Sequence, residues 1–275
     1  MTRTAAPVTP RTLALLRAAH GGPSLAVTSI TALLAVGADL GPARIVLVSA
    51  TVLSGQLSVG WSNDLIDRDR DRQVGRDDKP LVTGRLTERA VVVACACALV
   101  STFALSLACG PTAGLTHLAL CVGGGWAYNV GVKGTVWSWV PYAAAFGALP
   151  VVVSLTRTTA ELPPWWMPIT GALLGVGAHL VNALPDLADD ETTGVRGLPH
   201  RLGPRVSTYV AVTVLVAASL LIVTNAPALS ALGALAVIAV VGALAVVAVT
   251  GHGRTPFRAA MLIALVDVVA FVGAR

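Results

Sequence analysis

Apolar residues occur in long runs along most of the chain, and short polar breaks separate these runs. A helix needs a run of about 20 apolar residues to cross a hydrocarbon core roughly 30 Å thick. The breaks contain glycine, proline or charged residues, which are typical of the ends of such helices. The pattern therefore predicts an all-α polytopic membrane protein with nine transmembrane helices around a central cavity. The predicted spans cover residues 14–37, 42–62, 87–109, 112–131, 136–155, 165–187, 205–225, 228–250 and 257–274.

Two connections between the predicted spans are long and charged, and they cover residues 64–89 and 186–205. The other connections are short. We therefore expect a single transmembrane domain over residues 1–275, in which residues 1–11 form a flexible N-terminus.

Lysine and arginine divide unequally between the two faces that nine spans define. With the N-terminus in the cytoplasm, 16 of the 19 fall on the inner face, and only Arg44, Arg157 and Arg275 fall on the outer face. Cytoplasmic loops carry such an excess of positive charge. We therefore expect an integral protein of the bacterial cytoplasmic membrane with its active site facing the cytoplasm. The formal net charge of +5 then reflects topology and contact with anionic membrane lipid, and no nucleic-acid partner is expected.

Composition supports this reading, because 55% of the residues are hydrophobic and only 12% are charged, whereas soluble domains carry roughly 25% charged residues. The four cysteines all lie in apolar runs without a histidine at zinc spacing. We interpret them as buried small hydrophobic residues.

Ten of the 14 acidic residues fall in two short windows, which begin at Asp64 and Asp186. In the first window Asn63, Asp67 and Asp71 are spaced i, i+4, i+8, so they form one stripe on a helix that turns about 100° per residue. The second window repeats this spacing with Asn182, Asp186 and Asp190. Both stripes lie at the end of an even-numbered span and must face the same compartment. Opposed carboxylates supply the hard oxygen ligands that Mg²⁺ prefers, together with substrate phosphate.

Some of these acids have simpler interpretations. For Asp69, Asp77, Asp78 and Glu191 we favour ordinary solvated loop positions. An EF-hand loop starting at Asp67 is excluded because the required glycine at its sixth position is Arg72. The stripes themselves are harder to explain this way, because unpaired acids near the end of a span are costly and are functional candidates by default.

Several cations are predicted on the same face as the acids. Arg72, Lys79, Arg85 and Lys133 could clamp the oxygens of a diphosphate while a metal ion neutralises the remaining charge. For Arg68, Arg70 and Arg89 we favour a role as positive anchors on the inner face.

The residues of both windows resemble the signatures of the UbiA superfamily of intramembrane prenyltransferases. The segment Asn63-Asp64-Leu65-Ile66-Asp67-Arg68-Asp69-Arg70-Asp71 resembles its NDxxDxxxD motif, and Asp186-Leu187-Ala188-Asp189-Asp190 resembles its DxxxD motif. The segment Ala127-Tyr128-Asn129-Val130-Gly131-Val132-Lys133 resembles a tyrosine-to-lysine segment near the end of the fourth helix. The resemblance extends over nearly the whole chain.

The resemblance implies a magnesium site built from five residues: Asn63, Asp67, Asp71, Asp186 and Asp190. The four aspartates of this set, together with Lys133 at the diphosphate, are the expected catalytic residues. It also implies that Asp64 supports the first window and that Tyr128 lines the reaction pocket. Further substrate contacts are expected from Arg72, Lys79, Asn182 and Arg17, although a membrane-edge anchor is an alternative for Arg17. Two departures, Lys79-Pro80 for Arg-Pro and Asn182 for an acid in some members, leave the acceptor open.

These features predict a Mg²⁺-dependent enzyme that ionises an isoprenyl diphosphate and transfers the prenyl group to a small aromatic or lipid-like acceptor. An alternative with the same acids is a UbiA-related membrane terpene cyclase, in which the substrate's own double bonds capture the cation. A transporter or channel would instead require charges deep within spans or inverted repeats with broken helices. Away from the ends of the predicted spans, Asp267 is the only charged residue that they contain.

Overall fold

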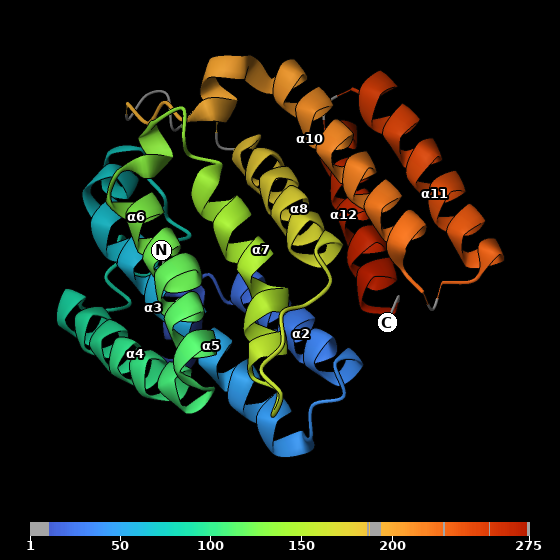
Figure 1. Ribbon diagram of the computed structural model, residues 1–275. Coiled ribbons are helices and arrows are strands. Elements are labelled where there is room, and N and C mark those ends of the chain that lie inside the picture. The colour runs from blue at the N-terminus through green and yellow to red at the C-terminus, as the bar shows by residue number, and fades with distance from the viewer. Residues whose placement is uncertain (1–10, 186, 188–193, 228, 253, 274–275) are drawn as a thin grey trace, which may run out of the picture.

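The computed structural model of the protein describes residues 11–185, 187, 194–227, 229–252 and 254–273. Within these ranges every regular element is a helix, so the all-α prediction is confirmed. Figure 1 shows the helices packed side by side in one bundle. The elements in chain order are α1 (Arg11–Ala18), α2 (Gly21–Gly37), α3 (Pro42–Gln73), α4 (Glu88–Ala108), α5 (Pro111–Thr116), the π-helix η1 (His117–Gly123), α6 (Gly124–Val130), the 3-10 turn η2 (Val132–Gly134), α7 (Val140–Leu155), α8 (Trp166–Ala183), α10 (Leu198–Asn225), α11 (Ala231–Thr250) and α12 (Thr255–Gly273).

Each predicted span overlaps a helix or a run of helices, but nine membrane crossings are not confirmed. Among the described helices, α3, α4, α10, α11 and α12 are long and apolar enough to cross a membrane. The pair α1 and α2 makes a sixth span if the two helices, bent by 73°, cross as one. The predicted span 112–131 is divided among α5, η1 and α6, and α7 has only 16 residues. Each of these helices is shorter than the helices that can clearly cross a membrane.

The first acidic window lies on α3, which continues 11 residues past its predicted end to Gln73. Alternating acids and arginines extend the helix, because ion pairs at i, i+3 join Arg70 to Asp67 and Arg72 to Asp69. A helix of 32 residues is about 48 Å long at 1.5 Å per residue, which exceeds a hydrocarbon core of roughly 30 Å. The last turns of α3 can therefore carry charged residues beyond the apolar layer.

Glycines allow a close helix contact between α7 and α8. A Cβ added at Gly171 would lie 2.5 Å from the carbonyl oxygen of Phe146, and one at Gly175 would lie 2.4 Å from that of Tyr142. This small-xxx-small spacing lets two membrane helices approach backbone to backbone. As a result, the ring of Tyr142 on α7 lies 4.9 Å from the ring of His179 on α8, measured between centroids.

The remaining helices close the bundle around this pair. Helix α2 contacts α3, α7 and α12, while α8 contacts α10 and α12 as well as α7. Helix α11 lies at one edge of the bundle in Figure 1 and contacts α10 and α12. Its outer face exposes large apolar side chains, among them Leu232, Leu235 and Val246. A long apolar face of this kind suits contact with lipid, as expected of an integral membrane protein.

Candidate active site

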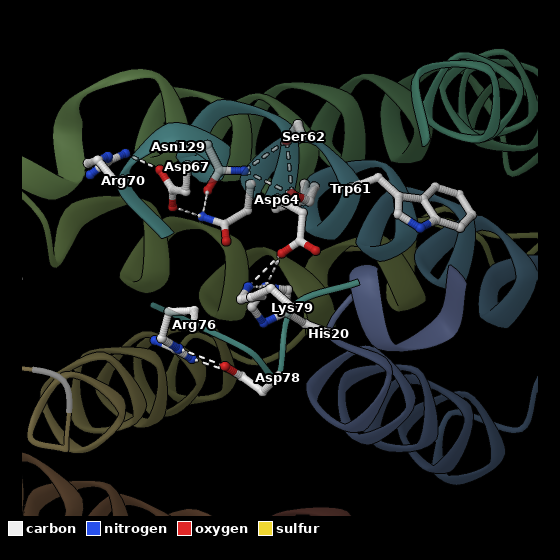
Figure 2. Close-up of polar contacts among 12 residues, drawn as sticks. His20, Trp61, Ser62, Asp64, Asp67, Arg70, Arg76, Asp78, Lys79 and Asn129 are labelled. Carbon is white, nitrogen blue, oxygen red and sulfur yellow. Dashed lines mark hydrogen bonds and ion pairs between the residues drawn. The ribbon is translucent and has the colours of Figure 1, made fainter. Parts of the chain in front are cut away.

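Asp67 lies at the centre of a charged cluster that α3 forms with the segment after α6. The Lys133 Nζ lies 2.5 Å from both carboxylate oxygens of Asp67, and Arg70 also donates to Oδ1. Asn63, one turn earlier on α3, donates to Oδ2 at 2.9 Å, as predicted by the i, i+4 spacing. The Asp67 side chain is only 16% exposed, so two cations balance a carboxylate that has lost most of its water. Figure 2 shows Asp67 beside Arg70 and the buried amide of Asn129.

Asn129 on α6 joins this helix to α3 and orients Asn63. Its Nδ2 donates to the Val59 carbonyl and to Ser62 Oγ, both at 2.8 Å, and its Oδ1 accepts from Asn63 Nδ2 at 3.2 Å. Asn129 is 3% exposed, so each of these polar atoms needs a partner inside the protein. The Asn129 amide therefore fixes the position of Asn63, which in turn holds Asp67.

Asp64 forms a second, deeper ion pair on the neighbouring face of α3. Lys79 Nζ lies 2.5 Å from Asp64 Oδ1 and 3.0 Å from His20 Nε2. The His20 Nε2 is also 3.4 Å from Asp64 Oδ1. Figure 2 shows Lys79 and His20 converging on this carboxylate from two different segments. Lys79 is thus engaged with Asp64 in the structure, and its predicted contact with substrate stays a prediction.

Two oxygen groups of the first window have no hydrogen-bond donor among the described residues. The Oδ2 of Asp64 is buried without a partner, although the residue is only 1% exposed. Asp71 is half-buried and accepts no hydrogen bond within the described ranges, and the charges acting on it come from Lys79, Asp67, Asp64 and Arg76. These oxygens remain available to a bound cation or water.

The second acidic window is represented by Asn182 alone, because Asp186 and Asp190 lie outside the described residues. Asn182 is exposed at the end of α8, three residues after His179, whose ring centroid lies 5.9 Å from that of Tyr128. The ring centroids of Tyr128 and Tyr142 are 5.3 Å apart. Because Tyr128 directly precedes Asn129, the end of α8 lies at the same end of the bundle as Asp67.

Other predicted cations stand apart from this cluster. Arg72 is exposed and pairs with Asp69 at 3.5 Å, so the structure does not bring it to Asp67. Arg85 and Arg17 are exposed. Arg68 contacts Asp69 and Glu88 on the outside of α3, which agrees with its interpretation as an anchor.

The loop after α3 contains an exposed ion pair between Arg76 and Asp78. Arg76 donates two hydrogen bonds to the carboxylate, at 3.0 and 3.2 Å. These hydrogen bonds hold the pKa of Asp78 below its ordinary value, and the nearby positive charges of Arg76 and Lys79 act in the same direction. Asp78 therefore remains a solvated surface acid, as its sequence context indicates.

Sequence reasoning missed several polar residues of this region, namely His20, Ser62, Ser138, Tyr142 and His179. The interpretation of Arg70 as an anchor was also wrong, because its side chain pairs with Asp67 inside the cluster. For His179 a signal was available, because it precedes Asn182 by three residues and so shares its helix face. For His20 no local pattern exists. Its contact with Asp64 depends on the bend between α1 and α2, where His20 adopts left-handed backbone angles, with φ of 53°.

No group of three acidic, histidine or cysteine side chains that could hold a metal ion occurs among the described residues, which lack Asp186 and Asp190. Two cavities, of about 240 and 610 Å³, lie where α3 begins and are lined by residues such as Asp39 and Arg157. This is the opposite end of α3 from Asp67. The central cavity expected beside the acids stays a prediction.

An apolar helical bundle that gathers paired carboxylates and cations at one end defines an integral membrane protein with a polar site beyond its lipid-facing body. The chain belongs to the UbiA prenyltransferase family, whose model matches residues 24–266. The predicted resemblance to this family is therefore confirmed.

Two similar proteins are each the 33 kDa chain of a bacteriochlorophyll synthase. The chain is 32% identical to that of Cereibacter sphaeroides over 184 residues, which are 63% of this chain and 60% of the relative. It is 29% identical to that of Rhodobacter capsulatus over 197 residues, which are 65% of this chain and 62% of the relative. The matched region thus spans under two thirds of either relative.

Solved structures share the fold. A digeranylgeranylglyceryl phosphate synthase matches with a TM-score of 0.68 at 17% identity, covering 97% of this chain and 99% of the other. A UbiA homologue from Archaeoglobus fulgidus bound to GPP and Mg²⁺ matches with 0.66 at 16% identity, covering 94% and 98%. The apo form of a UbiA homologue from Aeropyrum pernix matches with 0.71 at 19% identity, covering 88% and 96%.

Proposed function

We propose that the protein is a Mg²⁺-dependent enzyme that transfers the prenyl group of an isoprenyl diphosphate to a small aromatic or lipid-like acceptor. The observation that carries this proposal is the convergence of Lys133, Asn63 and Asp67 in one cluster, with Asp71 half-buried one turn further along α3. The cluster combines oxygen ligands for a metal with a cation for phosphate. This is the set of groups that a diphosphate leaving group requires.

The donor chemistry fits magnesium. Asp67, Asp71 and Asn63 offer hard oxygen atoms, and Asp71 has no competing donor among the described residues. We assign the metal ligands to these three residues together with Asp186 and Asp190 of the second window. Bound Mg²⁺ would neutralise part of the charge that develops on the leaving diphosphate.

The protein's own cations take the remaining part of that charge. Lys133 and Arg70 now balance Asp67, and both can turn to diphosphate oxygens when the carboxylate oxygens bind a cation. Lys133 is the better placed, because its side chain is only 11% exposed and its charge is therefore weakly screened. Stabilising the leaving group lowers the barrier to breaking the allylic C–O bond.

The electron-deficient prenyl group then needs surroundings without water. Tyr128 and Tyr142 present aromatic rings beside the end of α8, and ring faces attract cations. The prenyl chain itself is apolar and matches the lipid-facing surface of the bundle. A nucleophilic carbon or oxygen of the acceptor captures the prenyl group in this region.

Similar proteins support the isoprenyl diphosphate and the metal in this proposal. The Archaeoglobus fulgidus homologues were solved with GPP or DMAPP and Mg²⁺, which favours an isoprenyl diphosphate and this metal. The curated relatives act in bacteriochlorophyll synthesis by name, so an acceptor of that kind is the first to test.

We further propose that nine segments cross the bacterial cytoplasmic membrane and that the site faces the cytoplasm, as the charge asymmetry suggests.

The test is an assay of purified protein in detergent with labelled allylic diphosphates of increasing length, Mg²⁺ and a panel of acceptors. We expect diphosphate release that depends on both Mg²⁺ and an acceptor, and a prenylated product. Asp67→Asn, which removes a charged oxygen ligand, provides a control in which diphosphate release should fall strongly at the same Mg²⁺ concentration. Full turnover in excess EDTA would exclude the proposed mechanism, and a cyclised product without an acceptor would identify a terpene cyclase instead.

A further inference from the structure

Two hydrogen bonds link three segments that are distant in sequence and meet beside the cluster around Asp67. The backbone N–H of Leu198, at the start of α10, donates to Ser138 Oγ at 2.9 Å. Ser138 Oγ lies 3.0 Å from Nε2 of His179 on α8. Ser138 is fully buried and His179 is 2% exposed, so both polar groups depend on these contacts.

The burial of Ser138 fixes the direction of the second hydrogen bond. Its oxygen already accepts from Leu198, and its hydroxyl proton needs an acceptor. Among the described residues the only such acceptor is His179 Nε2. We therefore assign Nε2 as the acceptor and place the proton of the neutral imidazole on Nδ1.

The main chain of Gly197 lies close to both Ser138 and Lys133. A Cβ added at Gly197 would lie 2.5 Å from the Lys133 carbonyl oxygen and 3.0 Å from Ser138 Oγ. The main chain of Gly197 thus packs directly on the main chain of Lys133, at a distance that no side chain permits. The same Lys133 extends its Nζ to Asp67.

We infer that Ser138, His179 and Gly197 are positioning residues that hold the loop from Val132 to Ser138 so that the Lys133 ammonium meets the diphosphate. The loop is short, and its only regular element is the 3-10 turn η2. The hydrogen bonds from Leu198 and to His179 anchor its far end between α8 and α10. The action of Lys133 on the diphosphate belongs to the proposed function, on which this inference rests.

The chain offers a matched control in a second buried serine–histidine pair. Ser106 Oγ lies 2.8 Å from His117 Nδ1, and both residues are at most 1% exposed. Ser106 is near the end of α4, whereas Glu88 at its start contacts Arg68. At 1.5 Å per residue, Ser106 is about 27 Å from Glu88 along α4. Variants of this pair remove the same chemistry far from Lys133.

The experiment measures binding of inorganic diphosphate with Mg²⁺ by titration calorimetry, and the melting temperature of each variant, on the full chain in detergent. Gly197→Ala and His179→Leu should raise the diphosphate Kd about 10- to 100-fold, because a misplacement of about 1 Å has effects of this size. His179→Gln, whose carbonyl can accept from Ser138, should recover most of the affinity. Ser106→Ala and His117→Gln should lower the melting temperature and leave the Kd unchanged.

A second arm tests whether the effect passes through Lys133. In a Lys133→Ala background, Gly197→Ala should cause no further loss of diphosphate affinity. Wild-type Kd values in Gly197→Ala and His179→Leu would overturn the inference, as would losses that add fully to that of Lys133→Ala. Failure of the wild-type protein to bind Mg²⁺ and diphosphate would instead refute the proposed function itself.

Discussion

The ammonium of Lys133 lies 2.5 Å from both carboxylate oxygens of Asp67, although the two residues are 66 positions apart in the chain. Both side chains are largely buried, at 11% and 16% exposure. Charges in such surroundings interact more strongly than charges on an open surface. The cation is therefore held in a defined place before any substrate binds, which is the condition for preorganised electrostatic catalysis.

Removing this cation should lower the rate strongly. We expect Lys133→Ala to cost on the order of 2–4 kcal/mol of transition-state stabilisation, or roughly 10²–10³ in kcat/KM, as for other preorganised contacts. Steady-state kinetics at matched concentrations of folded protein measure the loss.

Arg68→Ala is the matched control, because it removes one positive charge from the same face of the protein. Arg68 contacts only exposed acids, Asp69 and Glu88, so its loss should change the rate little. Equal losses in both variants would mean that general positive charge, and not the placement of Lys133, serves the reaction.

The two neighbouring acids Asp67 and Asp69 should differ in metal dependence. Asp67→Asn removes a charged oxygen ligand from the cluster, so the Mg²⁺ concentration for half-maximal activity should rise at least tenfold, or activity should vanish. Asp69→Asn changes an exposed side chain that contacts Arg68 and Arg72 and should leave this concentration unchanged. A Mg²⁺ titration of initial rates separates the two, and similar curves would remove Asp67 from the metal site.

The pair of Asp64 and Lys79 should matter for stability. Breaking a buried ion pair by removing one partner typically costs about 3–5 kcal/mol, so Lys79→Met should lower the free energy of unfolding by this order. The double variant Asp64→Asn, Lys79→Met should lose less, because no unpaired charge remains. Arg76→Gln breaks an exposed pair with Asp78 and should cost less than about 1 kcal/mol. Unfolding curves in mixed micelles test this order.

Arg76→Gln should also raise the pKa of Asp78 toward its ordinary value of about 3.9. In the wild type this pKa is lowered, so the contact stabilises the fold at any pH above the ordinary value and is lost as the pH falls through the lowered pKa. Carboxyl ¹³C NMR of labelled aspartate follows the titration. An unchanged pKa in the variant would show that the hydrogen bonds from Arg76 have no such effect.

Gly60→Ala should disturb the fold near the acidic window. A Cβ at this position would lie 2.2 Å from the Ala19 carbonyl oxygen, where α3 crosses the bend between α1 and α2. We expect a loss of about 1–3 kcal/mol, as for other overpacked sites. Gly22→Ala is the control, because nothing lies within 4 Å of its Cβ. Thermal unfolding that ranks the two variants equally would contradict the close approach.

Local patterns predicted those parts of the site that lie on one helix. The spacing of Asn63 and Asp67 follows from helix geometry alone, and their hydrogen bond confirms it. The true end of α3 was missed because hydropathy falls at Asn63 while helix-stabilising ion pairs continue to Gln73. The division of residues 111–130 into α5, η1 and α6 was also missed, since apolar composition does not distinguish an α-helix from a π-helix.

The sequence pattern does not predict the contacts between segments that are distant in the chain. Asn129 belongs to the segment from Ala127 to Lys133 that resembles the family. Its hydrogen bonds to Val59 and Ser62, however, depend on how α6 packs against α3. Likewise, the meeting of Ser138 with His179 requires the close approach of α7 and α8. Such positions are set by tertiary packing, which a single sequence does not display.

The pairing of Asp67 with Lys133 and Arg70 also bears on the order in which ligands enter. The Lys133 ammonium reaches both carboxylate oxygens of Asp67, so a diphosphate must compete with Asp67 for its N–H groups. A free metal ion that displaced Lys133 from Asp67 would leave the partly buried Lys133 ammonium without an anion beside it. A metal ion that arrives with its diphosphate supplies a replacement anion. If the proposed function holds, we therefore expect the cluster to discriminate against free Mg²⁺ and to take up the metal ion together with the diphosphate.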